Sequence, residues 1–198
     1  MIGNIQPLAD IQQAEKKVEK KRSSDPVQAE YDDGIEFLKD KDLTQAAVAF
    51  HNALVGFEEK NHQDGIANAS NQLANVCLEK GDFEKAKSHY LRAWAICDRF
   101  EDTMSLLSLS GQLITVYRGL KEYDKAMGLC LDMLETHNLN NNPKDTVATM
   151  EIMADIYLEQ GEKSKAADAY RTIASIHENF KHNNFAKRFR EKADELEA

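Results

Sequence analysis

Residues 66–97 read IANASNQLANVCLEKGDFEKAKSHYLRAWAIC, and this stretch decides the fold. Its apolar residues recur at helical spacing on both sides of a short break at Gly81. The spacing predicts two helices joined by a tight turn. The unit is repeated along the chain, because the alanine of its second helix recurs every forty residues, at Ala46, Ala86, Ala126 and Ala166.

Larger side chains follow the same period. One column holds Phe37, Cys77, Tyr117 and Tyr157, and another holds Phe50, Tyr90, Cys130 and Tyr170. A small alanine lets the two helices of a unit approach closely, while these larger side chains fill the space between them. The helices are therefore expected at residues 27–40, 43–60, 64–80, 83–99, 103–119, 123–138, 144–160 and 163–180.

Helix starts carry their own signals. An acidic residue stands before each second helix, where a carboxylate meets unpaired N–H groups and the positive end of the helix dipole. Two further starts, Asp25-Pro26 and Asn142-Pro143, place a capping side chain before a proline at the first helical position. The four acidic residues are Asp42, Asp82, Glu122 and Glu162.

Composition agrees with an all-α protein. The 198 residues include only 3 Pro and 9 Gly, so helix breakers are few. Hydrophobic residues make up 42% and charged residues 30%, which excludes disorder of the whole chain. The formal net charge of -9 argues against a general nucleic-acid binder or a protein that binds anionic membranes.

Residues 66–97 resemble the tetratricopeptide repeat (TPR). The matching positions are Leu73, Ala74, Gly81, Phe83, Ala86, Tyr90 and Ala93. The resemblance covers about residues 27–180 and implies a right-handed superhelical solenoid of four helix-turn-helix repeats. The usual unit has about 34 residues, so the forty-residue unit is similar to the longer-helix subclass of kinesin light chains and some bacterial regulators. A repeat of this kind specifies a fold and says little of function.

We divide the chain into an N-terminal arm at 1–26, an array at 27–180 and a capping helix at 183–198. The array consists of repeats at approximately 27–62, 63–102, 103–142 and 143–182. When the forty-residue period is continued beyond the fourth repeat, apolar residues of the segment 183–198 fall into the core columns. This segment is therefore expected to be a helix that closes the array and has a solvated outer face. A detachable, partner-binding tail is the alternative. The apolar residues are Ala186, Phe189, Ala193 and Leu196.

The N-terminal arm has two readings. Leu8, Ile11, Ala14 and Val18 recur at helical spacing, and basic residues lie at positions 16–22. A frayed helix or a disordered leader accounts for this pattern. The alternative is an arm that lies in the groove of its own chain or of a neighbouring copy.

The resemblance implies that one polar sector of each first helix lines a concave, peptide-binding groove. On a helical wheel of residues 64–80 this sector lies opposite the apolar face. A merely solvated surface is the alternative reading. The same register in all four repeats predicts a groove lined by Tyr31, Ile35, Asn68, Asn71, Asn75, Glu79, Ser108, Gly111, Thr115, Arg118, Glu151 and Asp155.

Charge indicates the class of ligand. Residues 27–180 hold 15 Lys and Arg against 26 Asp and Glu, a net charge of -11, whereas each flanking segment carries +1. An acidic groove steers basic segments toward it and rejects acidic ones. We therefore expect a basic or amphipathic protein segment near Glu151, Asp155 and Glu159.

Motifs for chemistry are missing from the sequence. Cys77, Cys97 and Cys130 lack zinc-site spacing and fit reduced thiols of a cytoplasmic protein, and the first residues do not have the pattern of a signal peptide. There is no HExxH, phosphate-binding loop or GxSxG motif. We expect no enzyme activity, no cofactor and no metal.

Two functions remain open at this point. The first is a non-catalytic adaptor or scaffold that holds a protein segment across the groove. The second is a self-assembling structural protein in which the arm or the cap helix docks onto neighbouring copies. A regulator similar to bacterial TPR proteins is a third reading, for which the flanks leave no room for a separate effector domain.

Overall fold

The computed structural model describes residues 23–198, and the regular structure of this range consists of nine α-helices. Every predicted helix is confirmed to within one residue at each end. Residues 1–22 of the predicted N-terminal arm lie outside the described residues. The helices are α1 (Pro26–Lys39), α2 (Leu43–Glu59), α3 (Gln63–Glu79), α4 (Phe83–Arg99), α5 (Thr103–Gly119), α6 (Tyr123–Leu139), α7 (Pro143–Glu159), α8 (Lys163–Asn179) and α9 (Asn183–Glu197).

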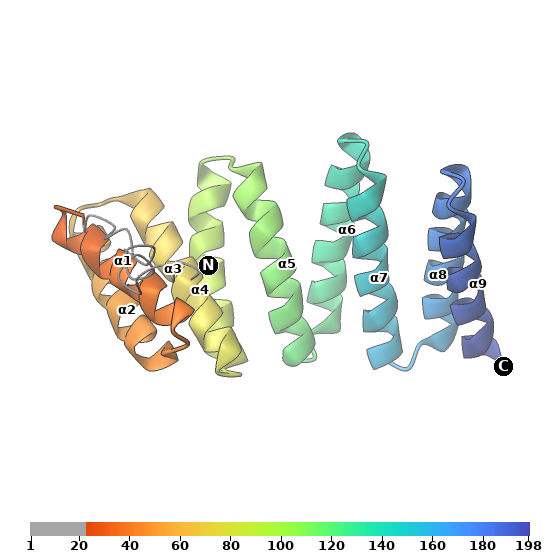
Figure 1. Ribbon diagram of the computed structural model, residues 1–198, viewed down its shortest axis with the longest axis horizontal. Coiled ribbons are helices and arrows are strands. Elements are labelled where there is room, and N and C mark those ends of the chain that lie inside the picture. The colour runs from red at the N-terminus through yellow and green to blue at the C-terminus, as the bar shows by residue number, and fades with distance from the viewer. Residues whose placement is uncertain (1–22) are drawn as a thin grey trace, which may run out of the picture.

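The helices stand side by side in chain order, from α1 at one end of the molecule to α9 at the other (Figure 1). Each helix packs mainly on its neighbours in the sequence, as expected of a solenoid. The connections α4–α5, α6–α7 and α8–α9 lie along one long edge of the molecule, the upper edge in Figure 1. The all-α repeat solenoid is thus confirmed.

All eight connections have the same geometry. Each consists of three residues, and the middle one adopts the left-handed conformation, with φ of 75° at Gly81 and 79° at Gly161. The other six are not glycine, although a left-handed conformation costs such residues roughly 1 kcal/mol: Lys41, Asn61, Glu101, Lys121, Asn141 and Lys181. Because α2 to α8 each have 17 residues, helix and turn together occupy twenty residues, half of the sequence period.

The acidic residues before the second helices divide into two groups. The carboxylates of Asp42 and Asp82 accept hydrogen bonds from backbone N–H groups of the first turn, as predicted. Glu122 and Glu162 make no such capping bond. Their side chains are one methylene longer, and the carboxylate of Glu122 instead accepts hydrogen bonds from Lys87 at 3.0 Å and Lys125 at 2.5 Å.

The repeating columns form the core. All four alanines of the forty-residue column are 0% exposed, and Phe50, Tyr90 and Cys130 are also completely buried. Buried side chains form three consecutive clusters, over α1–α4, α3–α7 and α7–α9. The last cluster includes Ala186 and Phe189 of α9, so this helix covers the end of the array as predicted.

The three cysteine thiols differ in burial, and therefore in how readily they ionise and react. Burial raises the pKa of Cys130 to about 11 and also raises the pKa values of the half-buried Cys77 and Cys97. At about pH 8, a thiol with a pKa near 11 is ionised in roughly one molecule in a thousand. We expect iodoacetamide to modify Cys77 and Cys97 first, and Cys130 only in urea, as followed by mass spectrometry. Equal labelling of Cys130 and Cys97 in the folded protein would contradict this ranking.

Candidate protein-binding groove

The polar sector of α3 lies at the surface, as the helical wheel predicts. Asn68 and Glu79 are exposed and Asn71 is half-buried, whereas Ile66 and Leu73 on the opposite side of the helix are buried. The division arises because apolar side chains at intervals of three and four residues turn one face of the helix toward its neighbours. Two chemically different faces therefore meet along one helix.

A small recess brings predicted residues of two repeats together. Asn68 and Asn71 of α3 lie across from Ser105 and Ser108 of α5, around a volume of about 70 Å³. Its remaining walls are formed by Ala67, Ala93, Cys97 and Leu109. The recess combines amides and hydroxyls at the surface with a partly apolar base, so it can hold a small side chain or a stretch of peptide backbone.

A chain of hydrogen bonds orients the amides beside this recess. The hydroxyl of Tyr90 donates to Oδ1 of Asn75 at 2.6 Å, and Nδ2 of Asn75 donates to Oε1 of Gln72 at 3.1 Å. Nε2 of Gln72 in turn lies 3.5 Å from the hydroxyl of Tyr31. Burial raises the pKa of Tyr90 to about 12, so its hydroxyl stays protonated and remains a donor.

This chain divides the predicted amides into two kinds. Asn75 already uses its carbonyl and one N–H within the fold, whereas no hydrogen bond within residues 23–198 engages the side chains of Asn68 or Asn71. Of the predicted groove residues Asn71 and Asn75, only Asn71 has both its donor and its acceptor free. Gln72 belongs to the same surface and was not predicted, although the wheel places it only about 40° from Asn68.

The first repeat is less accessible than predicted. The ring of Tyr31 packs edge-on against Phe50, with ring centroids 5.5 Å apart, and lies 6.4 Å from Phe57. Ile35 packs against the same cluster. The aromatic and aliphatic contacts expected at this end of the groove are therefore largely used by the core.

The last repeat is less acidic than its sequence suggests. The guanidinium of Arg118 on α5 donates two hydrogen bonds to Glu159 on α7, at 2.6 and 3.2 Å, and lies 3.9 Å from Asp155. The Glu159 carboxylate raises the pKa of Arg118 further. Glu151 and Asp155 accept no hydrogen bond from Arg118, so their carboxylates remain the acidic groups of this repeat that are open to a ligand. Arg118 of the third repeat thus binds Glu159, and more distantly Asp155, of the fourth repeat across the array.

The third repeat has open space at the predicted position. A Cβ atom at Gly111 would meet no atom within 4 Å. The nearby hydroxyl of Thr115 donates to the backbone carbonyl of Gly111 at 3.3 Å, while Ser108 is exposed. The third repeat thus has open space beside Gly111 that a ligand side chain could occupy.

Within residues 23–198, no three His, Cys, Asp or Glu side chains converge as metal ligands would. In the same range, none of the helices combines the length and the apolar character that a bilayer span requires.

No known protein-family model matches the sequence, and no curated protein matches it. Solved structures are similar to it in shape. The apo form of RapI superimposes with a TM-score of 0.71 at 18% identity, over 86% of this chain and 48% of RapI. The TPR-like repeats of a putative kinesin light chain from Podosopora anserina give 0.65 at 11% identity, over 89% and 98%.

A third structure is a Rap protein complexed with competence and sporulation factor. It gives a TM-score of 0.59 at 15% identity, over 86% of this chain and 55% of the Rap protein. The chain thus spans about half the length of the two Rap proteins. Together these likenesses show that the chain has the TPR-type helical-repeat fold.

Proposed function

We propose that this protein is a non-catalytic adaptor that holds a protein segment in the groove along α1, α3, α5 and α7. The observation that carries the proposal is the recess between α3 and α5, where Asn68 and Asn71 keep unused donors and acceptors at the surface. An amide can pair with both the N–H and the C=O of a bound peptide backbone, which favours capture without strict sequence preference.

Similarity to solved structures supports the proposal that this fold serves to bind a protein segment. A Rap protein with the same repeat architecture is complexed with competence and sporulation factor. The free thiols of this chain support a reducing compartment, and we place the protein in the cytoplasm.

We further propose that the bound segment is basic or amphipathic. The array carries a net charge of -11, and Glu151 and Asp155 supply carboxylates beyond the one that Arg118 occupies. A basic side chain of the ligand can approach Asp155 directly or displace Arg118 from Glu159. The field of the array attracts such a segment before contact, while exposed charges add little affinity by themselves.

Charge reversal in the last repeat tests this ligand class. We expect a synthetic amphipathic helix of lysines and leucines to bind the protein, and Glu151→Lys/Asp155→Lys to weaken its affinity by about tenfold or more, since about 1.4 kcal/mol corresponds to tenfold. Fluorescence anisotropy of the labelled peptide measures the dissociation constant.

The matched control changes the total charge by the same amount elsewhere. Asp132 and Glu135 are exposed on α6, a second helix of its repeat, so Asp132→Lys/Glu135→Lys should weaken binding far less. Equal losses in the two double variants would show that only net charge acts, and would overturn the groove as the binding site. An undiminished affinity of Asn68→Ala/Asn71→Ala would contradict the role of the free amides.

A further inference from the structure

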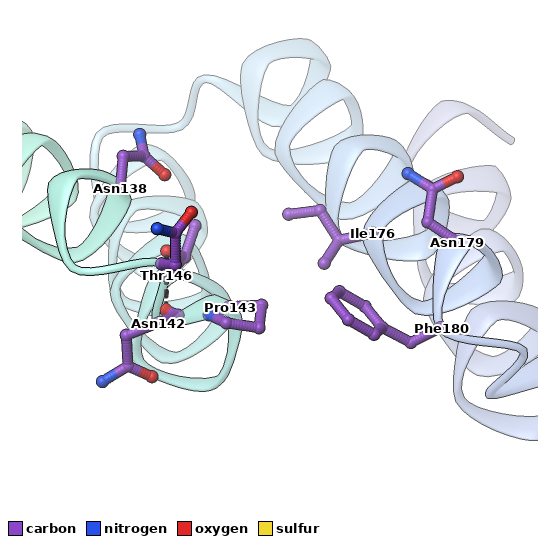
Figure 2. Close-up of a pocket in the computed structure, with 8 residues that line it drawn as sticks. Asn138, Asn142, Pro143, Thr146, Ile176, Asn179 and Phe180 are labelled. Atoms are coloured by element: carbon purple, nitrogen blue, oxygen red, sulfur yellow. Dashed lines mark hydrogen bonds between the residues drawn. The ribbon is translucent and has the colours of Figure 1, made fainter.

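A second cavity lies away from the groove, between the α6–α7 turn and the end of α8. Its volume is about 500 Å³, and Ile176 and Phe180 project from α8 toward Pro143 at the start of α7 (Figure 2). Four asparagines and Thr146 complete its lining. An adjoining cavity of about 220 Å³ shares Pro143, Ile176 and Phe180, so the two form one cleft. We call this the edge cleft, because it opens at the edge that carries the α6–α7 turn.

Two earlier repeats are bridged at the corresponding place. In the second repeat, the guanidinium of Arg99 at the end of α4 donates to Oε1 of Gln63 at the start of α3, at 2.5 Å. In the first repeat, the ammonium of Lys60 after α2 lies 2.6 Å from the carboxylate of Asp25 before α1. Each bridge joins the beginning of a first helix to the end of a second helix.

The fourth repeat lacks such a bridge. The positions of Gln63 and Arg99 are taken by Pro143, which has no polar side-chain atom, and by Asn179, which is shorter. Within the described residues, no hydrogen bond or ion pair joins the start of α7 to the end of α8. Phe180 is 53% exposed beside this opening. The first two repeats thus fold with this opening bridged, whereas the fourth repeat leaves an apolar wall accessible.

The charge around the edge cleft is opposite to that of the array. Lys144 lines the cleft, Lys181 follows Phe180, and neither ammonium has an ion-pair partner among residues 23–198. Of the two carboxylates close to these lysines in sequence, Glu178 pairs with Arg190 at 2.6 Å, whereas Asp145 keeps its charge and accepts a hydrogen bond from Nδ2 of Asn142 at 2.6 Å. Within the described part of the chain, two unpaired ammonium groups beside one carboxylate without an ion pair, that of Asp145, therefore leave this partly apolar surface with an excess of positive charge within an acidic solenoid.

We propose that the edge cleft is a second docking site, whose occupant is an acidic peptide segment that inserts one aromatic or large aliphatic side chain. The inserted side chain lies between Pro143 and the Ile176–Phe180 wall. Carboxylates beside it face Lys144 and Lys181, and the asparagine amides at the rim pair with the backbone of the segment. This ligand has the charge opposite to that proposed for the groove, so the two sites select different partners.

A panel of synthetic peptides tests the proposal with the full chain. The peptides share a central phenylalanine flanked by glutamates, and the comparisons replace the phenylalanine with alanine or the glutamates with lysines. We expect the parent peptide to bind at least about tenfold more tightly than either replacement. Its NMR footprint on the protein should be confined to residues 138–147 and 176–182. A footprint elsewhere, or equal affinity of the alanine peptide, would overturn the proposal.

A bridging variant supplies the sharpest test. Pro143→Gln/Asn179→Arg rebuilds the bridge of the second repeat, and we expect it to weaken the parent peptide by about tenfold while the circular dichroism spectrum stays unchanged. Phe180→Ala, at a half-exposed position, gives the same test if the double variant does not fold. Asn68→Ala/Asn71→Ala should leave this peptide unaffected, which separates the cleft from the groove.

Two outcomes count directly against the proposal. Unchanged affinity in both the bridging variant and Phe180→Ala would overturn it. Light scattering that shows a dimer of the wild type and a monomer of the bridging variant would identify a second copy of the chain as the occupant, and would overturn the peptide as the ligand.

Discussion

Replacing Phe50 with alanine is expected to lower the free energy of unfolding by about 3–5 kcal/mol. The ring is 0% exposed and packs against Tyr31. It also occupies the space that Gly34 leaves, since a Cβ atom at position 34 would lie 2.7 Å from the ring. Because Gly34 has no side chain that could move into the vacated volume, the cavity would remain and the full cost should be observed.

Urea unfolding followed by circular dichroism measures this loss. Hydrogen exchange should show that α1 and α2 lose protection while α8 and α9 keep it, because the helices of a solenoid depend mainly on their neighbours. Phe180→Ala is the matched control, and it should change stability by no more than about 0.5 kcal/mol because the ring is 53% exposed. A loss below about 1 kcal/mol for Phe50→Ala would contradict the packing described for the first repeat.

Enlarging the alanine column is expected to have the second largest effect. Ala126→Leu should destabilise the protein by about 1–3 kcal/mol. Ala126 is 0% exposed on α6 and belongs to the central cluster that extends from α3 to α7. Additional methylene groups there must push α6 away from its neighbours or force strained rotamers, since a packed interior has little free volume.

A glycine on the same helix provides a control of opposite sign. A Cβ atom at Gly128 would meet nothing within 4 Å, and Gly128 lies inside α6. Gly128→Ala should therefore stabilise the protein by about 0.5–1 kcal/mol through helix propensity. Thermal unfolding of the two variants and the wild type measures both changes in stability. If both changes acted in the same direction, the alanine column would not be the close contact between helices.

The order and type of the helices could be predicted from the sequence because their causes are local. Apolar spacing, the Asp42 and Asp82 caps and the prolines after Asp25 and Asn142 each act within one helical turn. The turns were predicted in place but not in detail, because glycine marks only two of the eight left-handed residues. Glu122 shows the limit of this reasoning, since its carboxylate is drawn to Lys87 of another helix.

The candidate groove could be predicted only in part. The helical wheel places Asn68 and Asn71 at the surface, and the structure adds a recess that they line together with Ser105 and Ser108 of the next repeat. The wheel does not show that Asn75 is engaged, because its partner Tyr90 belongs to the next helix. The availability of a polar group depends on its neighbours in space, and a pattern within one helix does not contain them.

The sequence by itself thus determined a repeated all-α array, its amphipathic faces and its acidic charge. These follow from interactions over three or four residues and from composition. Only the tertiary structure decided which polar groups are free. Arg118 meets Glu159 across 41 residues of sequence, and the edge cleft joins Pro143 to Phe180 across a helix pair. Such contacts arise when solenoid helices pack side by side, and packing brings together side chains that no local pattern relates.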